Sequence, residues 1–169
     1  MVEALDRHGV VYVLVGGVAA RLHGASRLTY DLDLCPAWHP DNLERLATAL
    51  QELGARLRDA PVDVVFPPIT GRTLRELRIG TWTTSAGDLD VLHDIPGRDP
   101  HHPKTYEQLA ARADRRQFLG VTILVADLGD IIVSKEITDR EKDREALPEL
   151  RALQAKRQGR HQRPGSDPA

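Results

Sequence analysis

The sequence lacks the features that mark secreted and membrane proteins. Its 169 residues contain a single cysteine, Cys35, so no disulfide can form within the chain. No apolar run approaches the roughly 20 residues that a membrane-spanning helix requires. The first residues also lack the basic and apolar segments of a signal peptide. We therefore expect a cytoplasmic protein without a membrane partner.

An excess of positive charge is also missing. The formal net charge is −2, which excludes a globally basic surface of the kind that binds nucleic acid. No internal repeat indicates a solenoid. We expect one globular domain over residues 1–156 and a disordered polar tail over 157–169. Lysine is rare beside arginine and occurs only at Lys104, Lys135, Lys142 and Lys156.

The hydrophobic pattern predicts an α/β or α+β fold, with helices packed around one small mixed sheet. A continuous apolar run predicts a buried strand over residues 10–15, and a period of two predicts another over 29–35. Asp41 is the expected N-cap of a helix that stops at Gly54. The other expected elements are a helix at 18–23, a loop at 58–72, a helix ending at 77, strands at 79–84 and 89–93, a mobile loop at 94–103, a helix at 106–113, a strand at 117–125, and helices at 127–137 and 139–156, the last kinked or restarted at Pro148.

Two carboxylates, Asp31 and Asp33, fall two residues apart in one expected strand. Alternate residues of a strand point to the same face, so these side chains would lie side by side and repel each other. A hard cation such as Mg²⁺ would compensate them, because it binds through one or two carboxylates together with substrate phosphates. The alternative is a solvated edge strand that carries two surface acids.

Asp90 repeats the acidic pattern in a second expected strand, where Asp88 is more simply a turn residue. If the two strands are neighbours, Asp90 completes a cluster of three carboxylates that could hold two metal ions. Gly16 and Gly17 lie between a buried strand and a helix. Paired glycines let the backbone approach a phosphate, although tight turns use them too.

Lys135 lies on the apolar stripe of its expected helix, in line with Leu128, Ile131 and Ile132. A lysine there must extend to water or find an anionic partner. A triphosphate or the carboxylate cluster would be such a partner. For most of the charged residues that follow, a solvated helix face is the simpler interpretation.

Together these residues resemble a known family. The sequence over residues 10–150 is similar to the AbiEii/MenT group of nucleotidyltransferase toxins, within the DNA polymerase β-like nucleotidyltransferase superfamily. The first part of the pattern is typical of the superfamily, and the part from Lys135 onward is typical of the toxin group. The pattern comprises Gly16-Gly17, Arg27-x-Thr29-x-Asp31-Leu32-Asp33-Leu34, Asp90, Lys135 and Arg140-x-Lys142-Asp143.

The resemblance implies roles for these residues. Asp31 and Asp33 would bind Mg²⁺, with Asp90 as a third carboxylate. Lys135 would contact the phosphates of an NTP, and Asp143 would be a further catalytic-site residue. Many superfamily members carry a serine at the position of Gly17, whose contact Thr29 would replace. The remaining implied nucleotide-binding residues are Gly16, Arg27 and Arg140.

The implied reaction is transfer of NMP from an NTP to RNA, with the tRNA 3′ end as the expected acceptor and pyrophosphate as the product. Such a toxin would block translation and would have a cognate antitoxin. Two alternatives stay open: an aminoglycoside or lincosamide nucleotidyltransferase, which the short chain disfavours, and a non-catalytic antitoxin-like partner with the same fold. The candidates for RNA phosphate contacts are Arg112, Arg115, Arg116 and the segment 156–163.

Overall fold

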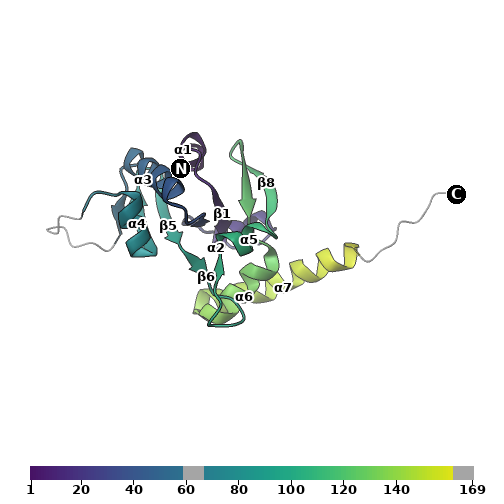
Figure 1. Cartoon of the computed structure of the whole chain (residues 1–169). Coiled ribbons are helices and arrows are strands. Elements are labelled where there is room, and N and C mark those ends of the chain that lie inside the picture. Colours follow the sequence, from purple (N-terminus) through teal and green to yellow (C-terminus); the bar gives the residue numbers. More distant parts are fainter. Residues whose placement is uncertain (59–66, 162–169) are drawn as a thin grey trace.

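The fold is organised by a mixed β-sheet. The structure, a computed structural model, describes residues 1–58 and 67–161 (Figure 1). In this part of the chain seven strands follow the order β3-β4-β5-β2-β1-β9-β8. β1 is antiparallel to β2 and parallel to β9, while β2 is parallel to β5, as the expected mixed sheet requires. The strands are β1 (Tyr12–Val15), β2 (Leu32–Pro36), β3 (Arg56–Leu57), β4 (Ile79–Thr84), β5 (Gly87–Leu92), β8 (Asp114–Phe118) and β9 (Val121–Val125).

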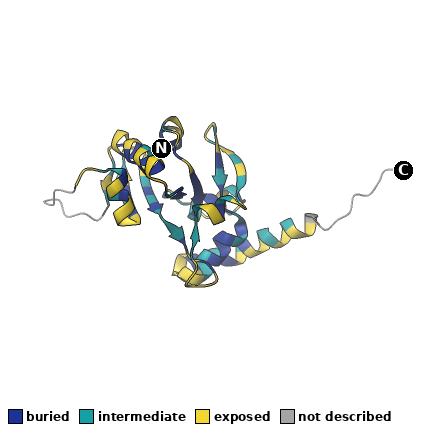
Figure 2. Ribbon diagram, viewed as in Figure 1, coloured by how far each residue is buried: buried dark blue, intermediate teal, exposed yellow. Residues whose placement is uncertain are grey.

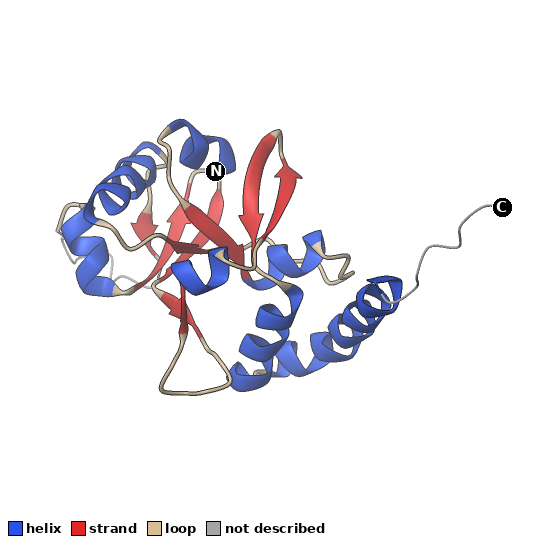
Figure 3. Cartoon of the chain, turned by 45° about the vertical axis from the view of Figure 1, so that its right-hand side comes forward, coloured by secondary structure: helices blue, strands red, loops and turns tan. Residues whose placement is uncertain are grey.

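Helices surround this sheet, and a small two-stranded sheet lies beside them. Figures 1 and 3 show α1, α3 and α4 gathered on one side of the molecule, with α6 and α7 together on another. The C-terminal part of α7 extends away from the body of the fold (Figure 1). The helices are α1 (Val2–Arg7), α2 (Gly16–Leu22), α3 (Pro40–Glu52), α4 (Gly71–Leu77), α5 (Tyr106–Ala110), α6 (Leu128–Thr138) and α7 (Glu141–His161), and the small sheet is β6 (Asp94–Ile95) with β7 (Lys104–Thr105).

The central strands form the core. β1 covers residues 12–15 of the strand expected over 10–15, and all four are buried as predicted, whereas Val11 is exposed and lies outside the strand. Leu34 and Cys35 of β2 are fully buried as well. Figure 2 shows buried residues concentrated in the central strands and in the helix faces that contact them. None of the described helices is both long enough and apolar enough to cross a bilayer.

Several expected element boundaries were wrong near the N-terminus. Helix α1 was not anticipated at all. The N-cap of α3 is His39 rather than Asp41, because Pro40 occupies the first helical position, where its missing N–H costs nothing. β2 begins at Leu32, so Asp31 lies just before the paired strand instead of within it. Helix α3 ends before Gly54, as expected. The backbone at Gly54 has a φ of +60°, which favours glycine.

Two later expectations were also wrong. The segment expected as a loop over 94–103 is a loop only from 96, because 94–95 form strand β6, which pairs with β7 directly after the loop. The single strand expected over 117–125 is a hairpin, because the chain reverses at Leu119 and Gly120, where φ is +50° and +81°. The apolar residues on both sides concealed this turn.

The C-terminal helices largely follow the pattern. The Asp127 side chain caps α6 by accepting a hydrogen bond from the Gly129 N–H at 2.9 Å. α7 runs through Pro148 without restarting and continues past the expected end of the domain to His161. The rest of the expected tail, 162–169, and part of the expected loop, 59–66, lie outside the described residues.

Candidate active site

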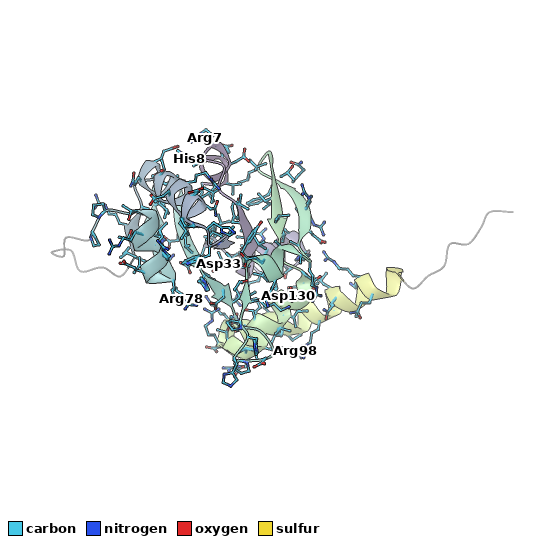
Figure 4. All side chains as sticks on the ribbon, in the orientation of Figure 1. Arg7, His8, Asp33, Arg78, Arg98 and Asp130 are labelled. Atoms are coloured by element: carbon cyan, nitrogen blue, oxygen red, sulfur yellow. The ribbon has the colours of Figure 1, made fainter. Side chains whose placement is uncertain are left out.

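The acidic residues converge where three central strands lie side by side. Asp33 of β2 is the register partner of Asp90 in β5 and of Val15 at the end of β1. Asp31 precedes β2 by one residue. Figure 4 shows Asp33 near the centre of the molecule. The structure therefore brings Asp90 beside the Asp31 and Asp33 pair, from which it is separated in the sequence.

The two glycines after β1 are required by close packing. Gly16 has a φ of +66°, and a Cβ atom there would lie 2.1 Å from Asp33 Oδ2. At Gly17 a Cβ atom would lie 2.8 Å from Thr29 Cγ2. The Gly17 N–H points to Asp33 Oδ2 at 3.4 Å. The Thr29 side chain thus fills the space that a side chain at position 17 would occupy.

Crowding and burial perturb the carboxylates. Burial, followed by repulsion from Asp90, raises the pKa of Asp33 from 3.8 to about 6. Burial also raises the pKa of Asp90, although the Arg58 guanidinium opposes that change. The ionised form of this cluster is destabilised, so the cluster favours the approach of a cation.

Arg58 already neutralises part of the cluster, and the sequence pattern did not reveal it. Its Nη2 donates to Asp90 Oδ1 at 2.9 Å, and its Nε lies 3.5 Å from Asp88 Oδ2. The contact depends on β3 lying beside β4, where the Arg58 N–H bonds the Thr81 carbonyl at 2.9 Å. Asp88 is thus a strand residue with a cationic partner, not a simple turn residue.

A second charged group involves Lys135, Arg140 and Asp143. Asp143 is fully buried, and its two oxygens accept from Lys135 Nζ at 2.8 Å and from Arg140 Nε at 2.7 Å. Burial alone would raise the pKa of Asp143, but these two hydrogen bonds hold it below its usual value. The anionic partner that Lys135 needs within the protein is therefore Asp143, and not the carboxylate cluster.

One cleft of about 320 Å³ joins these groups. It is lined by every predicted site residue except Asp143, which lies beneath Lys135 and Arg140. Leu28, Tyr30 and Lys142 also line it and were not predicted as site residues. The predicted residues in the lining are Gly16, Gly17, Arg27, Thr29, Asp31, Asp33, Asp90, Lys135 and Arg140.

Other predicted contacts are engaged elsewhere. Arg27 lines the cleft, but its guanidinium bonds Glu145 of α7 at 2.6 Å. Arg112 pairs with Asp127 at 3.0 Å, and Arg116 pairs with Asp114 at 2.9 Å. These last two arginines are therefore less available for RNA phosphates than the sequence suggested. Arg115 is exposed on β8.

The donor set suits one hard cation better than two. Within residues 1–58 and 67–161, no three carboxylate, histidine or cysteine side chains are arranged to hold a metal ion. Asp90 is bound to Arg58, which leaves Asp31 and Asp33 as the pair that could share a divalent ion. A Mg²⁺ site that uses one or two carboxylates together with substrate phosphates matches this arrangement.

Solved structures with the same fold include nucleotidyltransferases. The lincosamide antibiotic adenylyltransferase LnuA, lincomycin-bound, aligns with a TM-score of 0.58 at 12% identity over 90% of this chain and 92% of its own. ANT(2″)-Ia in complex with adenylyl-2″-tobramycin aligns with a TM-score of 0.54 at 16% identity, over 95% of this chain and 94% of its own. A Thermotoga maritima protein provisionally assigned as a nucleotidyltransferase aligns with a TM-score of 0.54 at 15% identity, over 87% of this chain and 85% of its own.

No protein-family profile and no curated protein sequence matches the chain. At these identities the structural similarity establishes the fold alone. The chain thus has the nucleotidyltransferase fold, which confirms the expected fold class.

The contact between Gly17 and Thr29 gives a first prediction. Gly17→Ala should lower the free energy of unfolding by about 1–3 kcal/mol, because the new methyl overlaps Thr29 Cγ2. In a Thr29→Ala background the loss should fall below about 1 kcal/mol, as urea denaturation would measure. Gly159→Ala, at a position with no atom near the added Cβ, is the control and should not destabilise. Equal losses in both backgrounds would contradict the packing described.

The raised pKa of Asp33 gives a second prediction, which concerns how stability depends on pH. Between pH 3.8 and about 6 the native state binds more protons at Asp33 than the unfolded state, so its contribution to stability falls as pH rises through this range. Asp33→Asn removes this cost. Without divalent cations the variant should be about 3 kcal/mol more stable than wild type at pH 8, because each pKa unit corresponds to about 1.4 kcal/mol, and equal to it near pH 3.5.

Urea unfolding at the two pH values checks this expectation. Asp41→Asn, at an exposed acid on α3, should differ from wild type by less than about 0.5 kcal/mol at either pH. Addition of Mg²⁺ should stabilise wild type more than Asp33→Asn. A variant that is less stable than wild type at pH 8 would show that the surroundings favour the charged carboxylate.

Proposed function

We propose that this protein is a metal-dependent nucleotidyltransferase that transfers NMP from an NTP to an acceptor hydroxyl and releases pyrophosphate. The observation that carries the proposal is the single cleft shared by Asp31, Asp33, Asp90, Lys135 and Arg140. Acids that repel each other need a cation. Lys135 and Arg140 share one carboxylate, Asp143, so this group keeps a net positive charge that an anion can balance. A triphosphate with its divalent ion satisfies both requirements.

Each group has a role in this proposal. Lys135 and Arg140 bind the phosphates, and Asp143 is a positioning residue that fixes both cations from below. Asp31 and Asp33 hold Mg²⁺, which when bound neutralises charge on the reacting phosphate. Asp90 accepts the proton of the acceptor hydroxyl, a task for which its raised pKa suits it.

The Gly16–Gly17 corner and Thr29 form the wall beside the phosphates. No side chain from either glycine projects into the cleft, and the Thr29 hydroxyl replaces a serine contact at position 17. The close packing of Thr29 against Gly17 supports this replacement, which the family resemblance implied.

For the acceptor we propose RNA, with the tRNA 3′ end as the specific site, in a cytoplasmic toxin that has a cognate antitoxin. The family resemblance supports this choice. Cations that could contact an RNA backbone line the cleft, although three of the four pair with Asp143 or Glu145. The cationic side chains are Arg27, Lys135, Arg140 and Lys142.

An antibiotic acceptor is the second candidate, because two of the structures with this fold are antibiotic-modifying proteins. The short chain was expected to disfavour this function. That expectation was wrong, since the chain covers 94% of ANT(2″)-Ia and 92% of LnuA in the alignments. Length therefore does not separate the two candidates, and the family resemblance is what favours RNA.

A transfer assay distinguishes these functions. The protein is incubated with Mg²⁺, each labelled NTP and one acceptor: total tRNA, tobramycin or lincomycin. We expect label on tRNA with wild type and none with Asp31→Ala, which lacks a metal-binding carboxylate. Label on an antibiotic alone would support the second candidate. A wild-type protein that binds no NTP and labels no acceptor would favour a non-catalytic antitoxin-like partner.

Lys135 gives a further prediction. Lys135→Gln keeps a donor for buried Asp143 but removes the charge, so the variant should fold and bind NTP about 10- to 100-fold more weakly. Equilibrium dialysis with labelled NTP measures the change. Lys156→Ala, at an exposed position on α7, is the matched control and should bind as wild type does. Unchanged affinity in Lys135→Gln would remove Lys135 from the phosphate site.

A further inference from the structure

Two large apolar side chains are exposed at the mouth of the cleft. Tyr30 is 85% exposed and Leu28 is 63% exposed, and both line the cleft. Thr29, which lies between them in the sequence, and Asp31, which follows Tyr30, are half-buried. The extended chain over 28–31 thus alternates, with its polar residues toward the interior and its apolar residues toward solvent. This order is the reverse of what burial of apolar area would produce.

The segment that carries these side chains is held in place. The Ser26 N–H donates to Glu149 Oε1 at 2.9 Å, and Arg27 bonds Glu145, so α7 fixes the start of the segment. Thr29 packs against Gly17, and Leu32 begins β2. Among the described residues, no hydrogen bond is made by the Tyr30 hydroxyl. An aromatic ring is therefore presented to solvent on a fixed backbone, at little further entropic cost for a ligand that covers it.

We propose that Tyr30 and Leu28 form the docking surface for the terminal nucleobase of the acceptor RNA. This inference rests on the proposed function and names the chemistry of its acceptor. A base stacks on an exposed aromatic face whatever its sequence. Lys142 lines the same cleft and provides a cation for the backbone phosphates of the strand.

The position of Tyr30 favours the acceptor base over the base of the NTP. In an in-line displacement the acceptor oxygen approaches the α-phosphorus opposite the departing pyrophosphate, so a new phosphorus–oxygen bond forms as the bond to pyrophosphate breaks. The wall assigned to the pyrophosphate contains Gly17 and Lys135. Tyr30 and the three carboxylates line the same cleft, so a base that covers the ring can direct its ribose hydroxyl toward them.

The test measures RNA and NTP binding separately. A fluorescein-labelled single-stranded RNA with a free 3′ hydroxyl is titrated with protein in Mg²⁺, and fluorescence anisotropy gives the Kd. Tyr30→Ala should weaken RNA binding about tenfold, and Leu28→Ala should weaken it severalfold. Tyr30→Phe should stay within about twofold of wild type. Leu119→Ala, at a similarly exposed leucine on the β8–β9 turn, is the control and should change nothing.

Equilibrium dialysis then gives the Kd for NTP, which should be the same for wild type and Tyr30→Ala. Weaker NTP binding with unchanged RNA binding would assign the ring to the NTP base and overturn the proposal. Unchanged binding of both ligands would also overturn it. Because binding needs no turnover, loss of RNA affinity in Tyr30→Ala would support this surface even if wild type transferred no label.

Discussion

Asp33 is a half-buried carboxylate with another acid, Asp90, as its cross-strand neighbour and Asp31 two residues before it. The parallel pairing of β2 with β5 creates this proximity, and the buried strands on either side prevent the acids from moving apart. The adjoining backbone has to accommodate the carboxylate, which is why only glycine fits at position 16. The need for a cation and the glycine corner in the wall of the cleft both follow from this crowding.

The second charged group shows how a buried ion pair can prepare a binding site. Asp143 has no exposure, and it holds Lys135 and Arg140 at one side of the cleft. A buried charge is costly unless it is paired and hydrogen-bonded, so the fold constrains both cations. The same principle explains Arg58, which compensates Asp90 at the other side. The resulting cleft carries both signs of charge in fixed positions, which is the arrangement that the proposed transfer would use.

Sequence patterns predicted the parts of the fold that depend on local order. The apolar run before Gly16 became β1, and the stripe that contains Lys135 became α6, because burial of one face leaves a clear period in the sequence. The β8–β9 hairpin was missed because its turn is framed by apolar residues, and Leu119 in the turn gave no signal of a positive φ. The β6–β7 pair was missed because strands of two residues leave no period.

For the site, the sequence by itself determined which side chains are present and the spacing of Asp31 and Asp33, because those features depend on neighbours along the chain. It also gave the resemblance that grouped them with Lys135. Only the tertiary structure decided which charges meet: Asp143 with Lys135, and Arg58 with Asp90. Such pairings join residues from different elements, so no local pattern encodes them. Exposure is decided in the same way, since whether Tyr30 is buried or faces the cleft depends on what packs against its segment.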